Sequence, residues 1–265
     1  MRFSDLLDAV RQHPLELSIP TEWAQGRASF GGLVAALQYE TMRAKVPAER
    51  PVRSLAITFV GPVTPDVPVS FEVEVLREGK AVSQVLGRAV QDGQVVTLVQ
   101  GSFGASRPSE VAVVAEEAPA MKHWDECPEL PYVKDVTPEF MRHLAMRWSI
   151  GGMPFTGNKS RDMGGWVRLR GDVKEEPLTE AHILALVDAW PPALLPHLTS
   201  VVPGSTLTWT IEFVQPLLAL STLDWCKYRV HIEHARDGYG HAAAALWSAE
   251  GQLIALSRQT VTIFG

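Results

Sequence analysis

The feature that constrains the fold most is an internal duplication, because segments of the second half repeat segments of the first half in the same order. The motif FVGP at residues 59–62 corresponds to FVQP at 213–216, and DGQVVTL at 92–98 corresponds to EGQLIAL at 250–256. The two pairs have nearly the same separation along the chain. Such self-similarity is typical of a repeated structural unit. The chain is therefore expected to fold as two related units.

Each unit is expected to combine an apolar helix with four antiparallel strands. In the first unit, helical spacing of apolar residues is followed by period-two alternation; the helix covers 33–46, and the strands cover 52–60, 69–76, 81–90 and 94–103. The second unit has a short strand at 166–170, a helix within 178–192, and strands at 206–214, 223–234, 239–248 and 252–264. This is the pattern of the hot-dog fold, in which a sheet wraps a helix. We predict an α+β fold, a double hot-dog of two helix-wrapped antiparallel sheets fused edge to edge, which would cover edges that are otherwise exposed.

The remaining segments divide the chain into an N-terminal unit (1–110), a connecting segment (111–163) and a C-terminal unit (164–265). The N-terminal unit is expected to open with an amphipathic helix at 1–13 and an edge strand at 15–23. The stretch 105–163 contains several prolines and is expected to be a long connection, with a possible helix at 138–148 and a loop over 149–165.

The helix within 178–192 carries one carboxylate, Asp188, in an otherwise apolar setting. Thr179 suits the N-cap, and Pro191 and Pro192 should end the helix. Its residues 183–190 are apolar on every side except at Asp188, which predicts a helix surrounded by other structure. An unpaired buried charge is costly, so Asp188 needs hydrogen-bond partners, a raised pKa or a solvated cavity. From the helix alone, a structural role and a functional role for Asp188 both remain open.

Composition excludes several classes of function. The net charge of −6 and the pI near 5.8 argue against nucleic acid and anionic membrane surfaces as partners. The two cysteines, Cys127 and Cys226, lie in different halves and predict neither a disulfide framework nor a metal site. Asp5 and Asp8 interrupt the apolar stretch that a signal peptide would need, and no run is long enough to span a membrane. We expect a cytoplasmic protein that needs no metal.

A set of motifs in both halves resembles the acyl-CoA thioesterase II family and its thioesterase-like relatives. The motifs are FGGLVAAL (30–37), RPVRSLAITFVGPV (50–63), LVDAWPPAL (186–194), STLTWTIEFVQP (205–216) and SAEGQLIALSRQ (248–259). The resemblance covers nearly all of the chain outside 105–163. It implies a double hot-dog fold, a homo-oligomer, and hydrolysis of acyl-CoA thioesters to free acid and CoA without a metal or cofactor. It also implies that an Asp, a Thr and a Gln hold the attacking water, which here are Asp188, Thr206 and Gln259.

The residues themselves support these roles unevenly. Gln259 shares strand parity with apolar neighbours such as Val261, so a polar group is expected on an inward face. Thr206 shares parity with polar residues, so simple alternation points it outward unless a twist or bulge follows Gly204. For substrate binding, we consider the amides of Gly31 and Gly32, which could polarise a carbonyl at a helix N-terminus.

One departure from the family pattern leaves a second function open. Arg53 occupies a position at which the family often has histidine, and arginine cannot act as a base near neutral pH. A catalytically silent protein that binds acyl-CoA or acyl chains therefore remains an alternative to the thioesterase. Hydration of enoyl thioesters would want an Asp and a His close together on one loop, which His182 and His197 do not provide around Asp188.

The duplication also predicts the number of sites. When the separations between the repeated motifs are subtracted from their residue numbers, Asp188, Thr206 and Gln259 correspond to Val34, Val52 and Gly101 of the first half. None of these three residues can transfer a proton. We therefore expect one working site per chain, built chiefly by the second half.

Overall fold

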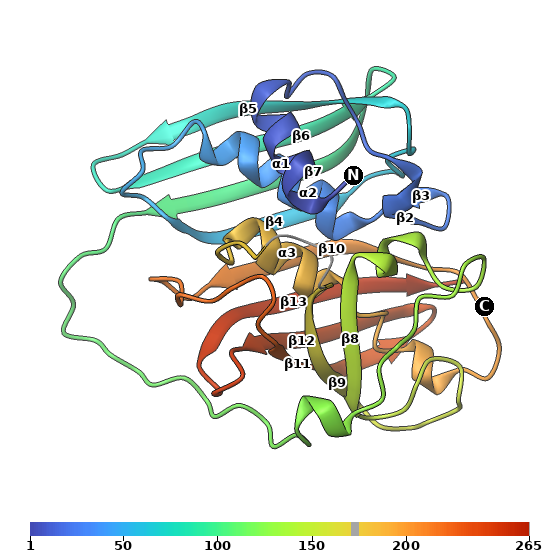
Figure 1. Ribbon diagram of the computed structural model, residues 1–265. Coiled ribbons are helices and arrows are strands. Elements are labelled where there is room, and N and C mark those ends of the chain that lie inside the picture. Colours follow the sequence, from blue (N-terminus) through green and yellow to red (C-terminus); the bar gives the residue numbers. More distant parts are fainter. Residues whose placement is uncertain (171–174, 265) are drawn as a thin grey trace.

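The computed structural model describes residues 1–170 and 175–264 and contains three α-helices and one large antiparallel sheet (Figure 1). The helices are α1 (Phe3–Gln12), α2 (Gly31–Arg43) and α3 (Glu180–Asp188). The large sheet contains β1 (Leu17–Ser18), β4 (Val52–Phe59), β5 (Pro68–Glu78), β6 (Val82–Gln91), β7 (Gln94–Gly104), β8 (Leu144–Ile150), β9 (Asp162–Leu169), β10 (Gly204–Phe213), β11 (Cys226–Arg236), β12 (Tyr239–Trp247) and β13 (Leu253–Ile263). A separate small hairpin is formed by β2 (Ala24–Gln25) and β3 (Ala28–Ser29).

The two halves join at a single pair of strands, β4 and β10, as the edge-to-edge prediction requires. The strand order is β1-β5-β6-β7-β4-β10-β13-β12-β11-β9-β8, so the first half lies on one side of the seam and the second half on the other. Ile57 lies opposite Trp209 across the seam, and the Trp209 side chain is fully buried. This arrangement confirms the double hot-dog architecture, because neither half ends at an open central edge.

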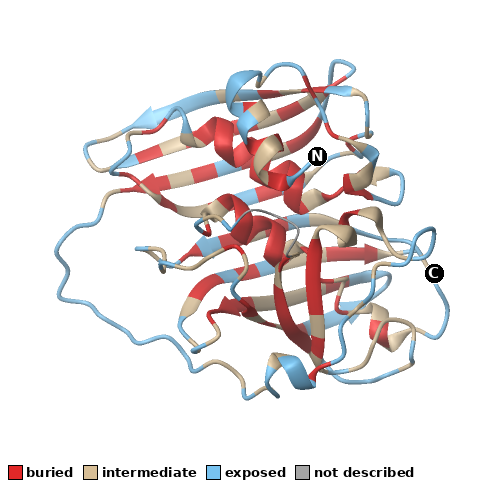
Figure 2. Ribbon diagram, viewed as in Figure 1, coloured by how far each residue is buried: buried red, intermediate tan, exposed pale blue. Residues whose placement is uncertain are grey.

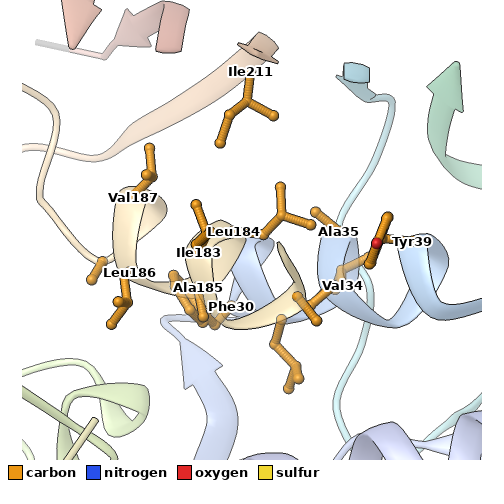
Figure 3. Packing of buried hydrophobic residues seen from close by; sticks show 14 of the residues in the cluster. Phe30, Val34, Ala35, Tyr39, Ile183, Leu184, Ala185, Leu186, Val187 and Ile211 are labelled. Atoms are coloured by element: carbon orange, nitrogen blue, oxygen red, sulfur yellow. The ribbon is translucent and has the colours of Figure 1, made fainter. Parts of the chain in front are cut away.

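Helices α2 and α3 pack against each other on the inner face of the sheet. Figure 3 shows Val34 and Ala35 of α2 near Ile183 and Leu184 of α3, and all four residues are buried. Figure 2 shows burial concentrated on these helices and on the strands behind them. The nearly all-round burial of α3 explains its apolar composition. Helix α1 lies over α2 and buries the four apolar residues of its predicted face, which are Phe3, Leu6, Leu7 and Val10.

The predicted helix at 138–148 is wrong. One short 3₁₀ turn, Glu139–Arg142, is followed by β8, which pairs with β9. A short apolar run such as Leu144 to Trp148 fits either a buried strand or a buried helix, and only its partner strand decides between them. The structure therefore extends the sheet of the second half into the segment 111–163; the boundaries of the independently folding units stay a proposal.

The predicted loop over 149–165 is also partly wrong, because β9 begins at Asp162. A Cβ atom on Gly165 would lie 1.9 Å from the Arg147 carbonyl oxygen, and one on Gly164 would lie 2.1 Å from that of Tyr228. The two glycines therefore allow β8, β9 and β11 to approach closely, a role of glycine in strands that resembles loop composition in the sequence.

Two other boundaries differ from expectation. The edge strand expected over 15–23 is reduced to Leu17–Ser18, because a 3₁₀ turn at Thr21–Trp23 follows Pro20. Helix α3 ends at Asp188, so this carboxylate lies at the end of the helix rather than in its middle. The helix stops there because Trp190 precedes Pro191, and helical backbone angles are unfavourable for a residue that precedes proline.

Candidate active site

Asp188 and Gln259 form a hydrogen-bonded pair at the end of α3. The Gln259 Nε2 group donates to Asp188 Oδ1 over 3.1 Å. On β13, Gln259 lies opposite the buried Trp209 of β10 and opposite Ala242 of β12, so it faces inward as its strand parity predicts. The fold thus brings together two residues that are far apart in the sequence, and it joins a carboxylate to an amide on an apolar surface.

Gly31 and Gly32 lie directly against the same carboxylate, at the first turn of α2. A Cβ atom on Gly31 would lie 3.0 Å from Asp188 Oδ2, and one on Gly32 would lie 3.0 Å from the Asp188 Cβ atom. Glycine is therefore needed here for close approach of two helices. The backbone N–H of Gly32 donates to Asp188, so this amide supports the carboxylate.

The environment of Asp188 raises its pKa to about 7, chiefly through burial. The hydrogen bonds from Gln259 and from the Gly32 backbone act in the opposite direction and favour the ionised form. The residue as a whole is mostly rather than completely buried, whereas the environment of the carboxyl group itself is that of a buried acid. A carboxylate with a pKa near neutrality is suited to accept a proton from water at physiological pH.

Thr206 is brought to the inner face by a bulge in β10. It lies opposite Val261, whereas Thr208 lies opposite Thr260, so Leu207 is an extra residue in the ladder. An extra residue reverses the side-chain alternation before it, and Thr206 therefore shares a face with Trp209 and Gln259. Among the described residues, the Thr206 hydroxyl makes no hydrogen bond to Asp188 or Gln259. Thr206 is on the correct face but lies outside the hydrogen-bonded pair.

A small cavity adjoins Gln259, between the chain that follows α3 and the inner face of the sheet. Its volume is about 10 Å³, which is space for one water molecule. It is lined by Pro191, Pro192, Ala193 and Leu194, by Tyr228 and Val230 of β11, by Gly240, His241, Ala242 and Ala244 of β12, and by Ser257, Gln259 and Val261 of β13. The sequence identified the prolines only as the end of a helix, whereas they also cover this cavity.

The equivalent positions of the first half carry no such machinery. Val34 and Val52 are buried in the core. A Cβ atom on Gly101 would lie 2.7 Å from a ring carbon of Phe103 and 2.8 Å from the terminal methyl group of Met42, so a larger residue there would have to displace these side chains. Arg53 also lies outside the Asp188 pair, since its Nε group donates to the Gly104 carbonyl oxygen over 2.9 Å.

Two features are absent from the part of the chain that the structure describes. Across residues 1–170 and 175–264, no three His, Cys, Asp or Glu side chains cluster as metal ligands would. No helix in the described part of the chain is both long enough and apolar enough to cross a membrane.

Sequence comparison gives a consistent family for both halves. The family model of the acyl-CoA thioesterase N-terminal domain matches residues 19–104, and that of the C-terminal domain matches residues 124–263. Acyl-CoA thioesterase 2 of Haemophilus influenzae is 25% identical over 250 residues, which cover 88% of this chain and 86% of that protein.

Solved structures agree with the fold. A hot-dog protein of unknown function from Alicyclobacillus acidocaldarius superimposes with a TM-score of 0.82 at 24% identity, covering 94% of this chain and 92% of that one. An acyl-CoA thioesterase II from Mycobacterium marinum gives a TM-score of 0.74 at 20% identity, with coverage of 94% and 92%. Because the C-terminal family model alone spans more than half of the sequence, this chain belongs to the acyl-CoA thioesterase family.

Proposed function

We propose that the hydrolysis of acyl-CoA thioesters by this chain takes place at the pair formed by Asp188 and Gln259. The observation that carries the assignment is a carboxylate with a pKa near 7 that accepts a hydrogen bond from Gln259, and Gln259 in turn lines a cavity of water size. In the reaction, ionised Asp188 accepts a proton from water as the water oxygen attacks the thioester carbonyl carbon. The carbon–sulfur bond then breaks, and the departing CoA thiolate takes a proton from Asp188, which yields free acid and CoA.

The other residues of the site have distinct roles in this proposal. Gln259 orients the Asp188 carboxylate through their hydrogen bond and has a second amide N–H available for water or substrate. The hydroxyl of Thr206 helps to hold the attacking water from the neighbouring strand. The Gly31 amide, at the first turn of α2, contributes to binding the substrate carbonyl, while the Gly32 amide supports Asp188.

We further propose a cytoplasmic homo-oligomer with a role in lipid metabolism, acting without nucleic acid, membrane or cofactor. Two free, buried cysteines suit a reducing compartment. Within residues 1–170 and 175–264, strand β5 pairs on its outer side with only the two residues of β1, and Val75 and Leu76 near its end are exposed. This leaves a strand edge that a second copy could cover. Light scattering of the purified chain tests this, and a monomer at micromolar concentration would refute the oligomer.

Release of free CoA thiol from a panel of acyl-CoAs tests the proposed function directly. The panel should span acetyl to long-chain substrates, with a chelator present. We expect steady turnover of at least one chain length at a rate that the chelator does not change. Binding of acyl-CoA without release of thiol would instead support the silent acyl-binding alternative.

A further inference from the structure

Tyr228 lines the same small cavity of the candidate site as Gln259. The intervening strand, β12, lines this cavity with Gly240, His241 and two alanines. Ala242 lies opposite Gln259, and Ala244 lies opposite Val230. Tyr228 lies on β11, opposite Leu246. Side chains from β11 and β13 line the same cavity. Its volume suits a group of the size of one water molecule, such as a carbonyl oxygen, which would there be bordered by both Tyr228 and Gln259.

The ring of Tyr228 is held in place by an aromatic stack. Trp190, two residues beyond Asp188, stacks on it with 5.0 Å between ring centroids and 7° between ring planes. Trp148 of β8 packs in turn on Trp190, with 5.2 Å between the two ring centroids. The stack thus links the ring of Tyr228 to the segment that carries Asp188. A side chain fixed in this way is pre-organised to place its hydroxyl.

The hydroxyl of Tyr228 has no partner of its own. The side chain is only 6% exposed, and none of the described residues forms a hydrogen bond with its hydroxyl. The hydroxyl is not one of the fully enclosed polar atoms that lack a partner among the described residues, so it reaches open space. A tyrosine hydroxyl without a protein partner is free to donate a hydrogen bond to a group that enters the cavity that Tyr228 lines.

The charge state of Tyr228 suits a donor. Burial raises the pKa of Tyr228 well above its ordinary value, and the nearby negative charge of Asp188 raises it further. The phenol therefore stays protonated near neutral pH. The Gly32 amide and one N–H of Gln259 are, in contrast, already bonded to Asp188, so these two donors are not available to the reacting carbonyl.

We propose that Tyr228 is a further catalytic residue, whose hydroxyl donates a hydrogen bond to the thioester carbonyl oxygen as that oxygen gains negative charge. The assignment rests on the proposed function, because it places the carbonyl between Gln259 and β11. No proton is transferred from Tyr228. Its O–H bond stays intact while the tetrahedral intermediate forms and collapses.

The variant Tyr228→Phe isolates the hydroxyl, because it keeps the ring and its stack. We expect kcat to fall by ~10²- to 10³-fold, as when a single oxyanion donor is removed from an active site, with little change in KM. Tyr39→Phe is the matched control. Tyr39 is a buried tyrosine on α2 of the first half, where it stacks on Phe103. The control should keep the wild-type kcat. Full kcat in Tyr228→Phe would overturn the proposal.

An infrared measurement keeps this test separate from the test of hydrolysis. A ketone analogue of an acyl-CoA, with a methylene group in place of sulfur, retains the carbonyl and cannot be hydrolysed. Bound to the wild type, its carbonyl band should lie at lower frequency than in solution, and Tyr228→Phe should move the band back while Tyr39→Phe does not. An identical band in the wild type and in Tyr228→Phe would refute the role of Tyr228, whether or not thiol release has established the proposed function.

Discussion

Replacing Asp188 by asparagine is expected to lower kcat/KM for thioester hydrolysis by ~10²-fold or more, the range for loss of a general base. Asparagine retains the shape of the side chain and an oxygen that can accept from Gln259, but it cannot take a proton from water. Thiol release from acyl-CoA measures the loss. Glu180→Gln, at the other end of the same helix, is the control and should keep most of the activity.

The stability of the Asp188→Asn variant separates a catalytic role from a structural one. The pKa of Asp188 rises from 3.8 in the unfolded chain to about 7 in the folded protein, so the folded state binds the proton more tightly. Stability linked to this group is fully present below about pH 4 and decreases as the pH rises through 7. Asparagine removes that decrease, so the variant should be at least as resistant to heat as the wild type at pH 8. A variant that hydrolyses at full rate, or that merely unfolds, would contradict the assignment.

Replacing Gln259 by alanine is expected to lower the whole activity of the chain by about 10- to 10²-fold, which corresponds to losing a hydrogen bond to a charged group. The loss also raises the pKa of Asp188 further, because the bond from Gln259 favours the ionised carboxylate. Gln252→Ala, which changes an exposed glutamine beside the same strand, should leave the rate unchanged. Thiol release under saturating substrate makes the comparison.

The same variant tests whether a chain has one site or two. The buried valines at positions 34 and 52 leave the first half without proton-transfer groups, so no second site should remain active in Gln259→Ala. Calorimetric titration of the wild type with the ketone analogue should accordingly saturate near one equivalent per chain. Half of the activity retained in the variant, or two equivalents bound, would show two working sites.

The sequence predicted the double architecture because the repeat is preserved in letters and in element order. It could not predict β8, since the apolar run at Leu144–Ile150 fits a helix as well as a strand and only its pairing with β9 decides. The start of β9 could not be predicted either, because glycines such as Gly164 and Gly165 are typical of loops. Their role in the close approach of neighbouring strands is evident only from the structure.

The candidate site was predicted in part. Strand parity oriented Gln259 correctly, but the same rule pointed Thr206 outward, because alternation does not reveal the extra residue at Leu207. Proximity of Asp188 to Gln259 depends on how α3 lies over β13, which no local pattern specifies. The sequence did not predict a role for Tyr228. It alternates with Val230 and Ile232, and this pattern is typical of an ordinary buried strand.

The pH dependence of kcat/KM tests most directly whether Asp188 activates the attacking water. The base must be ionised in the free enzyme, so kcat/KM should rise with pH along a limb whose midpoint lies near 7, the pKa that burial gives to Asp188. The limb should persist in Tyr228→Phe at a lower rate and disappear from the residual activity of Asp188→Asn. A wild-type profile that is flat from about pH 5 to 8, or one whose midpoint lies near the ordinary aspartate value of about 4, would contradict the account.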